Sequence, residues 1–393
     1  MSNAYHSAPS AYDYPLIIKQ LLNRAKTVSQ AQEIIYADKK RFTYSEFFTR
    51  INRLANVLDS LNLDAGDVIA VMDWDSHRYL ESYFAIPMSE YVLQTVNIRL
   101  SPEKVLYTVN HAKPKVLMLN SEFAPLVKDY QFENSSIEHI IWLDDNGTTV
   151  EGVFGDNQSR VIGEYETLLA DASDEFEFPD FDENTIATTF YTSGTTGNPK
   201  GVFFSHRQLV LHSMAEAATL GMLPDKQGVS YGDVYMPMTP MFHVHAWGFP
   251  YTATMTGLKQ VYPGRYAPDT LLDLIINEKV SITHCVPTIL QMVLKEAQDR
   301  DAGQPDRRQR RIEPARAAKD RCENGGHDGG CVGAHAVALV GDHILQTGAS
   351  RPTRRAAEFA QRGLGHEEQH MRFPFLPHLQ LKQITNQLFQ FLF

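Results

Sequence analysis

Apolar residues along the first 299 positions recur with two different spacings, and stretches of each kind alternate. From Thr43 onward they stand three or four positions apart, the spacing of one helix face; they are Phe47, Ile51, Leu54, Ala55 and Leu58. Thr43 and Glu46 can cap this helix, because each side chain can satisfy an exposed backbone amide. Short continuous apolar runs, typical of buried strands, follow at Val68–Met72, 116–119 and 140–143. The alternation predicts an α/β fold with at least partly parallel sheets.

Other boundaries can be placed in the same way. Ser101-Pro102 predicts a helix start, because proline at the first helical position loses no hydrogen bond. Residues 144–184 are acidic and poor in apolar residues, and we interpret them as a loop-rich, solvated connection. Residues 185–191 are rich in β-branched and aromatic types and predict a strand. Ser205 and Gln208 form a second capping box, which opens a helix that ends near Gly221.

A loop of Gly, Ser and Thr follows directly on the strand predicted over 185–191. Its glycines allow successive backbone amides to form a nest for an anion, and its hydroxyl groups can donate hydrogen bonds to phosphate oxygens. Lys200 adds a compact positive charge for pyrophosphate. The spacing between Gly194 and Lys200 differs from that of P-loop NTPases. A merely flexible turn is the alternative interpretation.

Eleven consecutive residues, Tyr191 to Gly201, match one pattern, which disfavours that alternative. The pattern resembles the signature of the adenylate-forming superfamily. The flanking sequence is similar to medium- and long-chain fatty-acyl-CoA ligases, including the methylmercaptopropionyl-CoA ligase branch. The stretches that carry this similarity are residues 11–16, 72–79, 95–103, 240–247 and 284–288. The resemblance covers roughly residues 11–302 and implies the large N-terminal domain of the adenylate-forming fold.

The resemblance also implies a reaction and a set of site residues. A carboxylic acid would react with ATP and Mg²⁺ to give acyl-AMP, and CoA would then displace AMP. Thr192, Lys200 and His243 would take the main roles: Thr192 at the metal, Lys200 at the phosphates and His243 at the acyl carboxylate. The other residues implied at the phosphates are Ser193, Gly194, Thr195, Thr196 and Gly197.

On the acyl side, Trp247 matches an aromatic gate of long-chain relatives, although a plain core role carries similar weight. Val286 is implied as acyl lining, with Gly257 and Ile289 as further candidates for which a core role is equally compatible. The turn at Pro287-Thr288 would line the same side. Two departures from the family pattern stand out. His245 replaces an expected Asn, and Ser89-Glu90-Tyr91 stands where a small Gly-Ala-like pair is expected.

Charge changes abruptly near Arg300. Residues 1–299 carry a net charge of −15 and residues 300–393 a net charge of +4, within the overall −11. The last 94 residues hold 12 Arg but only 2 Lys. They lack the family's adenine motif Tyr-Gly-x-Ser/Thr-Glu, its ribose motif Thr-Gly-Asp, its hinge motif and its adenylation lysine. We therefore expect an incomplete AMP-binding N-terminal domain over 1–299, a non-homologous, poorly ordered Arg-rich tail over 300–393, and no small C-terminal domain.

A reading-frame shift after about residue 300 explains the tail best. An Arg-rich nucleic-acid patch is disfavoured, because the tail has no interleaved aromatics, and Cys322, His327 and Cys331 lack the spacing of a metal site. The chain is then by ancestry a carboxylate–CoA ligase that we expect to be inactive. The alternatives are a working ligase with a divergent C-terminal half and a non-catalytic nucleotide- or acyl-binding remnant.

Composition sets the broad class. The chain is 43% hydrophobic and 21% charged, which is ordinary for a globular protein, and it contains no apolar run of about 18 residues that could span a membrane. The start has no signal-peptide pattern, and three cysteines form no disulfide framework. We expect a cytoplasmic protein, and homodimer formation is left open.

Overall fold

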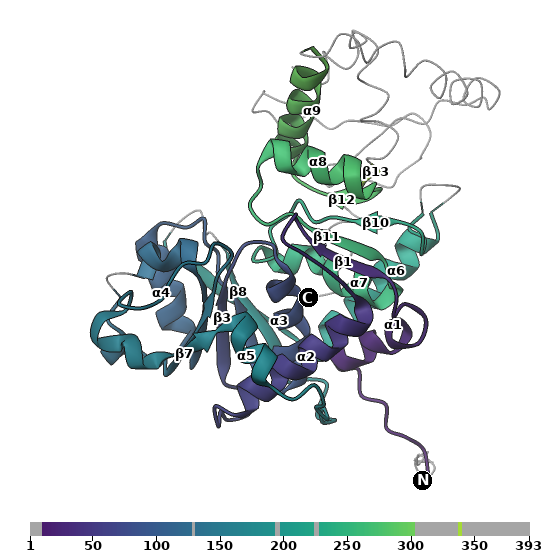
Figure 1. The fold of residues 1–393 in the computed structure, drawn as a ribbon. Helices are drawn as coiled ribbons and strands as arrows, with labels where there is room; N and C mark the ends of the chain where they lie inside the picture. Colours follow the sequence, from purple (N-terminus) through teal and green to yellow (C-terminus); the bar gives the residue numbers. More distant parts are fainter. Residues whose placement is uncertain (1–9, 128–129, 193–196, 224–227, 303–336, 340–393) are drawn as a thin grey trace, which may run out of the picture.

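Two β-sheets lie side by side in the computed structural model, which describes residues 10–127, 130–192, 197–223, 228–302 and 337–339 (Figure 1). One sheet has seven strands in the order β7-β6-β5-β3-β4-β8-β9. The other has six strands in the order β13-β12-β10-β11-β1-β2. The predicted α/β fold is confirmed.

The seven-stranded sheet is parallel except for its edge strand β9, which runs antiparallel to β8. Its strands are β3 (Val68–Met72), β4 (Val92–Thr95), β5 (Val116–Asn120), β6 (His139–Leu143), β7 (Val161–Glu164), β8 (Ile186–Thr192) and β9 (Lys200–Ser205). Strands β3, β5 and β6 match the predicted apolar runs, and β8 matches the strand predicted from β-branched and aromatic residues. Each is buried over most of its length, as a central strand between helix layers should be.

The six-stranded sheet combines a parallel centre with antiparallel edges. Strands β10, β11, β12 and β1 run parallel, while β2 and β13 pair antiparallel at the two ends. The bounds are β1 (Glu33–Tyr36), β2 (Lys40–Thr43), β10 (Val234–Tyr235), β11 (Lys259–Tyr262), β12 (Ile282–His284) and β13 (Val337–Leu339). Apart from β13 and residues 300–302, the tail predicted over 300–393 lies outside the described residues.

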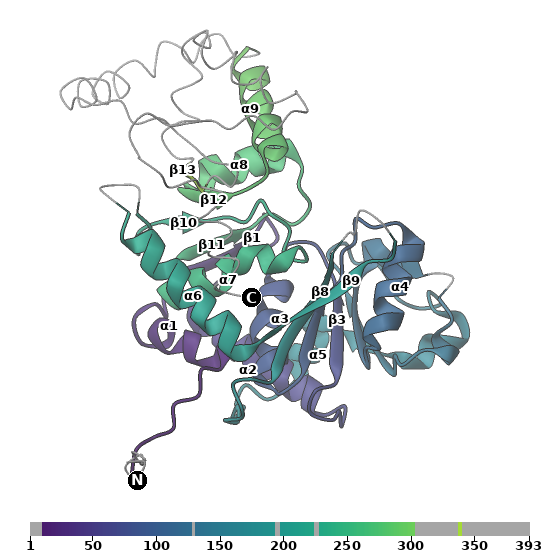
Figure 2. The same cartoon turned by 180° about the vertical axis from the view of Figure 1, so that it is seen from behind.

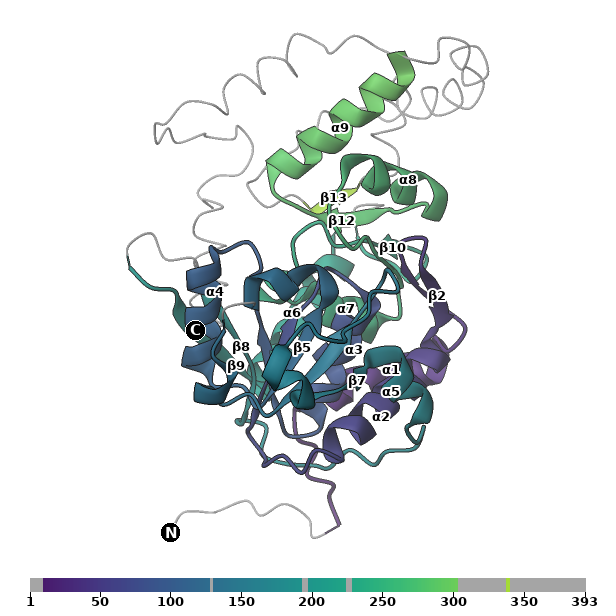
Figure 3. The same ribbon diagram turned by 60° about the vertical axis from the view of Figure 1, so that its left-hand side comes forward.

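Helices cover the sheets and fill the space between them. They are α1 (Leu22–Val28), α2 (Tyr44–Asp59), α3 (His77–Met88), α4 (Pro102–Ala112), α5 (Tyr165–Asp171), α6 (His206–Gly221), α7 (Phe249–Thr256), α8 (Pro268–Glu278) and α9 (Pro287–Ala302). The 3₁₀ turns are η1 (Ile18–Leu21), η2 (Ser121–Val127), η3 (Phe132–Asn134), η4 (Gly155–Arg160) and η6 (Val244–Gly248). Figure 2 shows α6 beside the β8–β9 pair, and Figure 3 shows α8 and α9 beyond β12 at one end of the molecule.

The main core joins the two sheets through α3. Tyr83 of α3 stacks on Tyr251 of α7 with ring centroids 5.2 Å apart, and both side chains are fully buried. Phe84 meets Tyr251 and Phe47 of α2 edge to face. Helix α2 begins as predicted, because Thr43 and Glu46 form the reciprocal capping box. One large apolar cluster therefore spans both sheets, and two smaller clusters line the six-stranded sheet.

The interpretation of residues 144–184 as a solvated, loop-rich connection is partly wrong. This interval contributes η4, β7 and α5, and its carboxylates enter the interior. Asp145 pairs with Arg78, whose side chain is 1% exposed, and Glu166 pairs with Arg50. The acidic residues are in part the partners of buried arginines, which a local reading of charge could not reveal.

Two connecting segments bear on the expectations from the sequence. Pro287 begins helix α9, so residues 287–288 belong to a helix start and not to an isolated turn. At the corner Ser89-Glu90-Tyr91, where a small Gly-Ala-like pair is expected, Glu90 takes a backbone conformation that favours glycine. Helix α3 ends at Met88, Glu90 has a φ of 64°, and β4 begins at Val92.

Candidate active site

The Gly/Ser/Thr-rich loop connects two antiparallel neighbours in the seven-stranded sheet. Strand β8 ends at Thr192 and β9 begins at Lys200, and these two exposed residues are register partners. Side chains of directly opposed residues lie on the same face of a sheet, so Thr192 and Lys200 flank the loop together. The strand predicted before the loop is confirmed as β8, and the residues after the loop form the strand β9. Of the five other residues predicted at the phosphates, Ser193, Gly194, Thr195 and Thr196 lie outside the described residues.

Gly197 belongs to the described end of the loop. It has a φ of 88°, in the left-handed region that favours glycine, and no atom of the described residues lies within 4 Å of where a Cβ would stand. The backbone conformation therefore accounts for the glycine. This is what a tight return from β8 into β9 needs.

Three loops meet at one edge of the sheet. Strands β3, β4 and β8 are parallel neighbours, so the segments that follow them leave the sheet at the same edge. In open parallel sheets this carboxyl edge is where ligands bind. The segment after β3 contains Trp74 and Asp75, the segment after β4 contains Arg99, and the segment after β8 is the loop itself.

His243 stands at the end of a backbone segment that the seven-stranded lobe holds in place. Asp75 Oδ1 accepts the Met241 N–H at 2.9 Å, and the Tyr83 hydroxyl donates to the Met241 carbonyl at 2.5 Å. The Thr95 hydroxyl donates to the carbonyl of the next residue, Phe242, at 3.2 Å. All three anchoring side chains are buried. These three side chains come from the seven-stranded lobe, and they therefore hold the backbone that leads to His243 in position.

The imidazole of His243 is itself exposed. Partial burial, and after it the positive charge of Arg99, lower the pKa of His243 below its ordinary 6.5. The ring is accordingly neutral at pH 7. A neutral imidazole has one N–H donor and one acceptor to offer to a ligand.

The turn after His243 has an unusual backbone. Residues 244–247 all have φ between 48° and 59°, which is the left-handed region. Trp247 lies on this turn, partly buried, and its carbonyl accepts a hydrogen bond from His212 Nε2 at 2.8 Å. Non-glycine residues in this conformation are strained, and such strain clusters at functional sites. The structure thus brings His243 and Trp247 together on one short strained segment.

His245 was assigned no role from the sequence, yet it is the most enclosed polar group of this segment. Its ring is 1% exposed and lies among Tyr83, Phe190 and Phe204, with centroid separations of 5.7, 5.4 and 6.0 Å. Burial lowers its pKa to about 3, so it is neutral. Its departure from the expected Asn was the available signal, but nothing in the sequence showed that the ring is buried.

Val286 lies apart from the segment that carries His243 and Trp247. Its side chain is 52% exposed in the connection between β12 and α9, and no described contact joins it to His243. Ile289 packs against the core cluster beneath α8, which favours its core role. Gly257 ends α7 with a φ of 72°, and a Cβ there would stand 2.0 Å from Ser29 Oγ. Packing and backbone conformation therefore account for this glycine.

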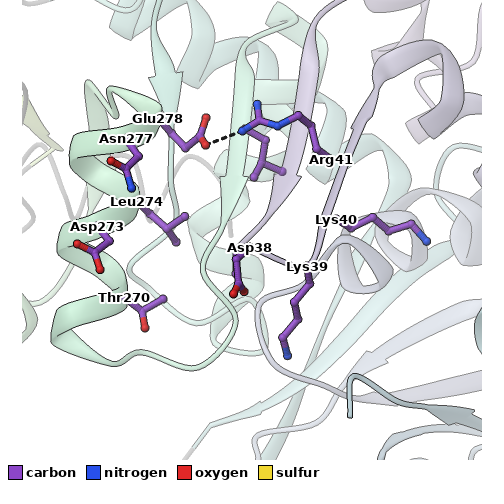
Figure 4. Close-up of a pocket in the computed structure, with 11 residues that line it drawn as sticks. Asp38, Lys39, Lys40, Arg41, Thr270, Asp273, Leu274, Asn277 and Glu278 are labelled. Carbon is purple, nitrogen blue, oxygen red and sulfur yellow. Dashed lines mark hydrogen bonds and ion pairs between the residues drawn. The ribbon is translucent and has the colours of Figure 1, made fainter. Parts of the chain in front are cut away.

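A separate pocket of about 500 Å³ lies between the β1–β2 hairpin and α8 (Figure 4). Its three cations are engaged: Lys39 with Asp145, Lys40 with Glu166, and Arg41 with Glu33 and Glu278. No residue predicted for the site lines it. We assign this pocket no role.

Two features are absent from the described part of the chain. No group of three or more His, Cys, Asp or Glu side chains there could hold a metal ion. No helix there is both long enough and apolar enough to cross a membrane.

Known proteins with similar sequences include several CoA ligases. The long-chain-fatty-acid–CoA ligase of Thermus thermophilus is 37% identical over 292 residues, which are 73% of this chain and 50% of that protein. The 3-methylmercaptopropionyl-CoA ligase of Ruegeria lacuscaerulensis is 36% identical over 72% of this chain and 52% of that protein. The medium-chain-fatty-acid–CoA ligase of Ectopseudomonas oleovorans is 36% identical over 71% and 50%. The chain spans about half the length of these curated relatives.

Solved structures support the same fold. An anthranilate CoA ligase in complex with anthranoyl-AMP matches with a TM-score of 0.61 at 22% identity, over 72% of this chain and 52% of that one. A long-chain-fatty-acid–CoA ligase from Archaeoglobus fulgidus also has a TM-score of 0.61, at 20% identity over 75% and 56%. The family model described as "AMP-binding enzyme" matches residues 22–370. Fold, sequence relatives and family model therefore agree that this chain belongs to the AMP-binding enzyme family.

Proposed function

We propose that this chain carries the ATP-phosphate and carboxylate sides of an ATP-dependent carboxylate–CoA ligase. The observation that carries the proposal is the pairing of Thr192 with Lys200 across the loop that follows β8. The anchored His243 segment supports it, because Thr95 of the neighbouring strand β4 holds that segment. A fatty carboxylate is the favoured substrate class, because the names of two relatives specify long- and medium-chain fatty acids.

In the proposed reaction, a carboxylate oxygen attacks the α-phosphorus of ATP. A new P–O bond forms, the bond from that phosphorus to the bridging oxygen breaks, and pyrophosphate leaves. The CoA sulfur then attacks the acyl carbon, the thiol proton is lost, and AMP leaves. Such chemistry depends mainly on positioning and on neutralising charge. Lys200 with the loop amides and hydroxyls would neutralise the phosphates, and the neutral His243 ring would orient the carboxylate.

The described residues would supply only one of the ligands that Mg²⁺ needs. Thr192 offers one hydroxyl oxygen at the end of β8. Magnesium sites at nucleotides typically use one or two protein oxygens, with phosphate oxygens and water completing the shell. Thr192 would therefore hold the ion together with the triphosphate, and the ion would supply charge for the phosphates.

The acyl chain would lie on the side of Trp247. This ring is partly buried and shares the strained turn after His243, which supports a role in shaping the acyl site. Val286 is proposed with less structural support, because it is exposed and stands on a different segment. Cytoplasmic location and homodimer formation stay predictions.

We further propose that the 393-residue chain as printed does not complete the reaction. Its sequence lacks the adenine, ribose, hinge and adenylation-lysine motifs. Without adenine and ribose contacts, the loop binds only phosphates. Without the lysine, the α-phosphate loses an electrostatic contact worth about 10²–10³ in rate. This absence favours a second candidate function, that of a non-catalytic nucleotide- or acyl-binding protein.

Calorimetric titration of pyrophosphate and Mg·ATP into the purified chain tests the proposed site. We expect Lys200→Ala to weaken binding about tenfold or more, because a charge-assisted contact is lost. Lys295→Ala is the matched control, since Lys295 is an exposed lysine on α9. Equal binding by all three proteins would remove Lys200 from the site.

Turnover is the second measurement. The coding DNA translated in the other frames beyond codon 300 should reveal the missing motifs in order. A chain with that frame restored should release pyrophosphate when carboxylate is present and should release AMP only when carboxylate and CoA are both present. His243→Ala should slow acyl-AMP formation on the order of tenfold. Turnover of ATP with fatty acid and CoA by the printed chain would overturn the proposed inactivity.

A further inference from the structure

Two arginines near the candidate site make no hydrogen bond or ion pair through their guanidinium groups with any residue that the structure describes. Across the described ranges, the guanidinium groups of Arg24, Arg41, Arg50, Arg53, Arg78, Arg160, Arg207 and Arg300 each make hydrogen bonds or ion pairs. Arg99 and Arg265 are the described arginines that make neither. Both are exposed, in a chain with a net charge of −11 that offers many carboxylates.

Each of these guanidinium groups is instead held over an aromatic ring. Arg99 Cζ lies 5.6 Å from the centroid of Tyr266, and Arg265 Cζ lies 6.0 Å from a ring centroid of Trp74. Stacking on a ring fixes the plane of a guanidinium while its N–H donors stay available at the edge. The two guanidinium groups are therefore fixed in orientation, and their N–H donors remain available to a ligand.

The two rings are themselves fixed, and they belong to one cluster. The Tyr266 hydroxyl donates to Asp75 Oδ2 at 2.5 Å, and Asp75 is the chain neighbour of Trp74. Trp74 Nε1 donates to Glu122 at 3.1 Å. Arg265 directly precedes Tyr266 in the chain. The guanidinium groups of Arg99 and Arg265 therefore lie on either side of the short segment that contains Trp74 and Asp75.

Asp75 interacts electrostatically with Arg99 but forms no ion pair with either guanidinium group. Its carboxylate is 2% exposed, and its two oxygens are used by the Met241 N–H and the Tyr266 hydroxyl. Through the Met241 contact, the cluster is attached to the segment that ends in His243. Arg99 also acts on the His243 ring electrostatically, since its charge contributes to the lowered pKa of that imidazole.

The cluster lies at the ligand-binding edge of the sheet. Trp74 follows β3 and Arg99 follows β4, and the phosphate loop follows β8, the next parallel strand. We propose that Arg99 and Arg265 form an oxyanion site that binds a carboxylate or phosphate group of a substrate. The choice of these ligands rests on the proposed function. A planar guanidinium matches both groups through paired N–H donors.

Calorimetric binding to the full chain tests this site with defined probes: octanoate, pyrophosphate, CoA and dephospho-CoA. Arg99→Gln and Arg265→Gln remove the charge and keep much of the side-chain length. Arg24→Gln is the matched control, because Arg24 also stacks on a tyrosine, with its Cζ 5.7 Å from the Tyr231 centroid. Arg99→Lys keeps the charge and tests the need for paired donors. Melting temperatures establish that each variant is folded.

We expect both Gln variants to weaken binding of one probe about tenfold at unchanged melting temperature, with Arg99→Lys intermediate and Arg24→Gln unchanged. An effect on octanoate identifies a carboxylate, an effect on pyrophosphate a nucleotide phosphate, and an effect on CoA but not on dephospho-CoA the 3′-phosphate. Unchanged binding of every probe, or no binding of any probe by the parent chain, would overturn the proposal. Loss of pyrophosphate binding in Lys200→Ala alone would leave the proposed function standing without this site.

Discussion

Glu90 occupies a backbone conformation that favours glycine. Its φ is 64°, its side chain is exposed, and its carbonyl accepts the Gly66 N–H at 2.8 Å. A side chain in the left-handed region costs about 1 kcal/mol relative to glycine. We therefore expect Glu90→Gly to stabilise the protein by about 1 kcal/mol in urea unfolding. Ser89→Gly is the control: its φ of −93° is ordinary, so it should bring no gain. Equal effects of the two changes would contradict the assignment.

Asp75 makes stability depend on pH in an unusual direction. Burial raises its pKa to about 7 from 3.8, so the folded state holds its proton more tightly than the unfolded state does. Rising pH through this window therefore destabilises the fold. The neutral variant Asp75→Asn lacks this loss, so its stability relative to the parent should rise by up to about 4 kcal/mol between pH 4 and pH 7.5.

Urea unfolding of both proteins at the two pH values measures this difference. Glu216 also has a raised pKa, about 8, because it is buried beside Thr252. It is present in the parent and in the variant, so its contribution cancels in the comparison. A constant difference between the two proteins across the pH range would show that Asp75 titrates normally.

At the scale of elements, the starts of two helices can be tested separately. Thr43 caps α2 and Ser205 caps α6, each in a reciprocal capping box. Replacing either by Ala should cost about 1 kcal/mol, because a helix-end amide loses its acceptor. Ser101→Ala is the matched control, because Ser101 precedes α4 without any side-chain capping bond. Urea unfolding should show a loss for the first two variants and little change for the third.

The same elements show which parts of the fold were predictable. Capping boxes and apolar runs are local, so α2, α6, β3 and β8 could be placed from neighbouring residues alone. Strand β7 and helix α5 could not, because the charges that surround them are balanced by distant residues. Asp145 meets Arg78 across 67 positions of sequence, and Glu166 meets Arg50 across 116. A local reading treats such charges as solvated.

Part of the candidate site could likewise be predicted from the sequence, and part of it could not. The loop between Thr192 and Lys200 and the His243 motif could be found because their residue types are contiguous. The cluster of Asp75, Tyr266 and Arg99 could not, because its members come from three separate segments. They meet only when β3 and β4 pair and the chain returns past β11. Sequence patterns identify chemistry within one segment, whereas shared sites require the topology.

At the scale of the whole molecule, a buried ionic network joins the two sheets. The Tyr36 hydroxyl of β1 donates to Asp145 Oδ2 at 2.6 Å, and Asp145 pairs with Arg78 of α3 at 2.9 Å. Arg78 also meets Asp73 at 3.1 Å and lies over the Tyr36 ring. The first hydrogen bond connects the six-stranded sheet to the seven-stranded one. The network therefore resists separation of the two lobes.

The variant Asp145→Asn should show how much this ionic network contributes to the free energy of unfolding. The change leaves the buried Arg78 guanidinium with one carboxylate fewer, and removing one partner of a buried pair costs about 3 kcal/mol. Tyr36→Phe should cost only about 1 kcal/mol, because it removes one hydrogen bond. Lys39 also pairs with Asp145, but its side chain is 39% exposed, so Lys39→Ala should cost little. Urea unfolding at pH 7 ranks the three variants.

The pH dependence of the Asp145→Asn deficit provides an independent check. Arg78 holds the pKa of Asp145 well below its usual 3.8, although burial alone would raise it. A carboxylate with a depressed folded pKa contributes its full stability above its unfolded pKa and loses that contribution as the pH falls toward the folded value. The deficit should therefore be constant from pH 7 to about pH 5 and should narrow below about pH 4. If it stays constant down to pH 2, or if Lys39→Ala costs as much as Asp145→Asn, the carboxylate charge is not what joins the two lobes.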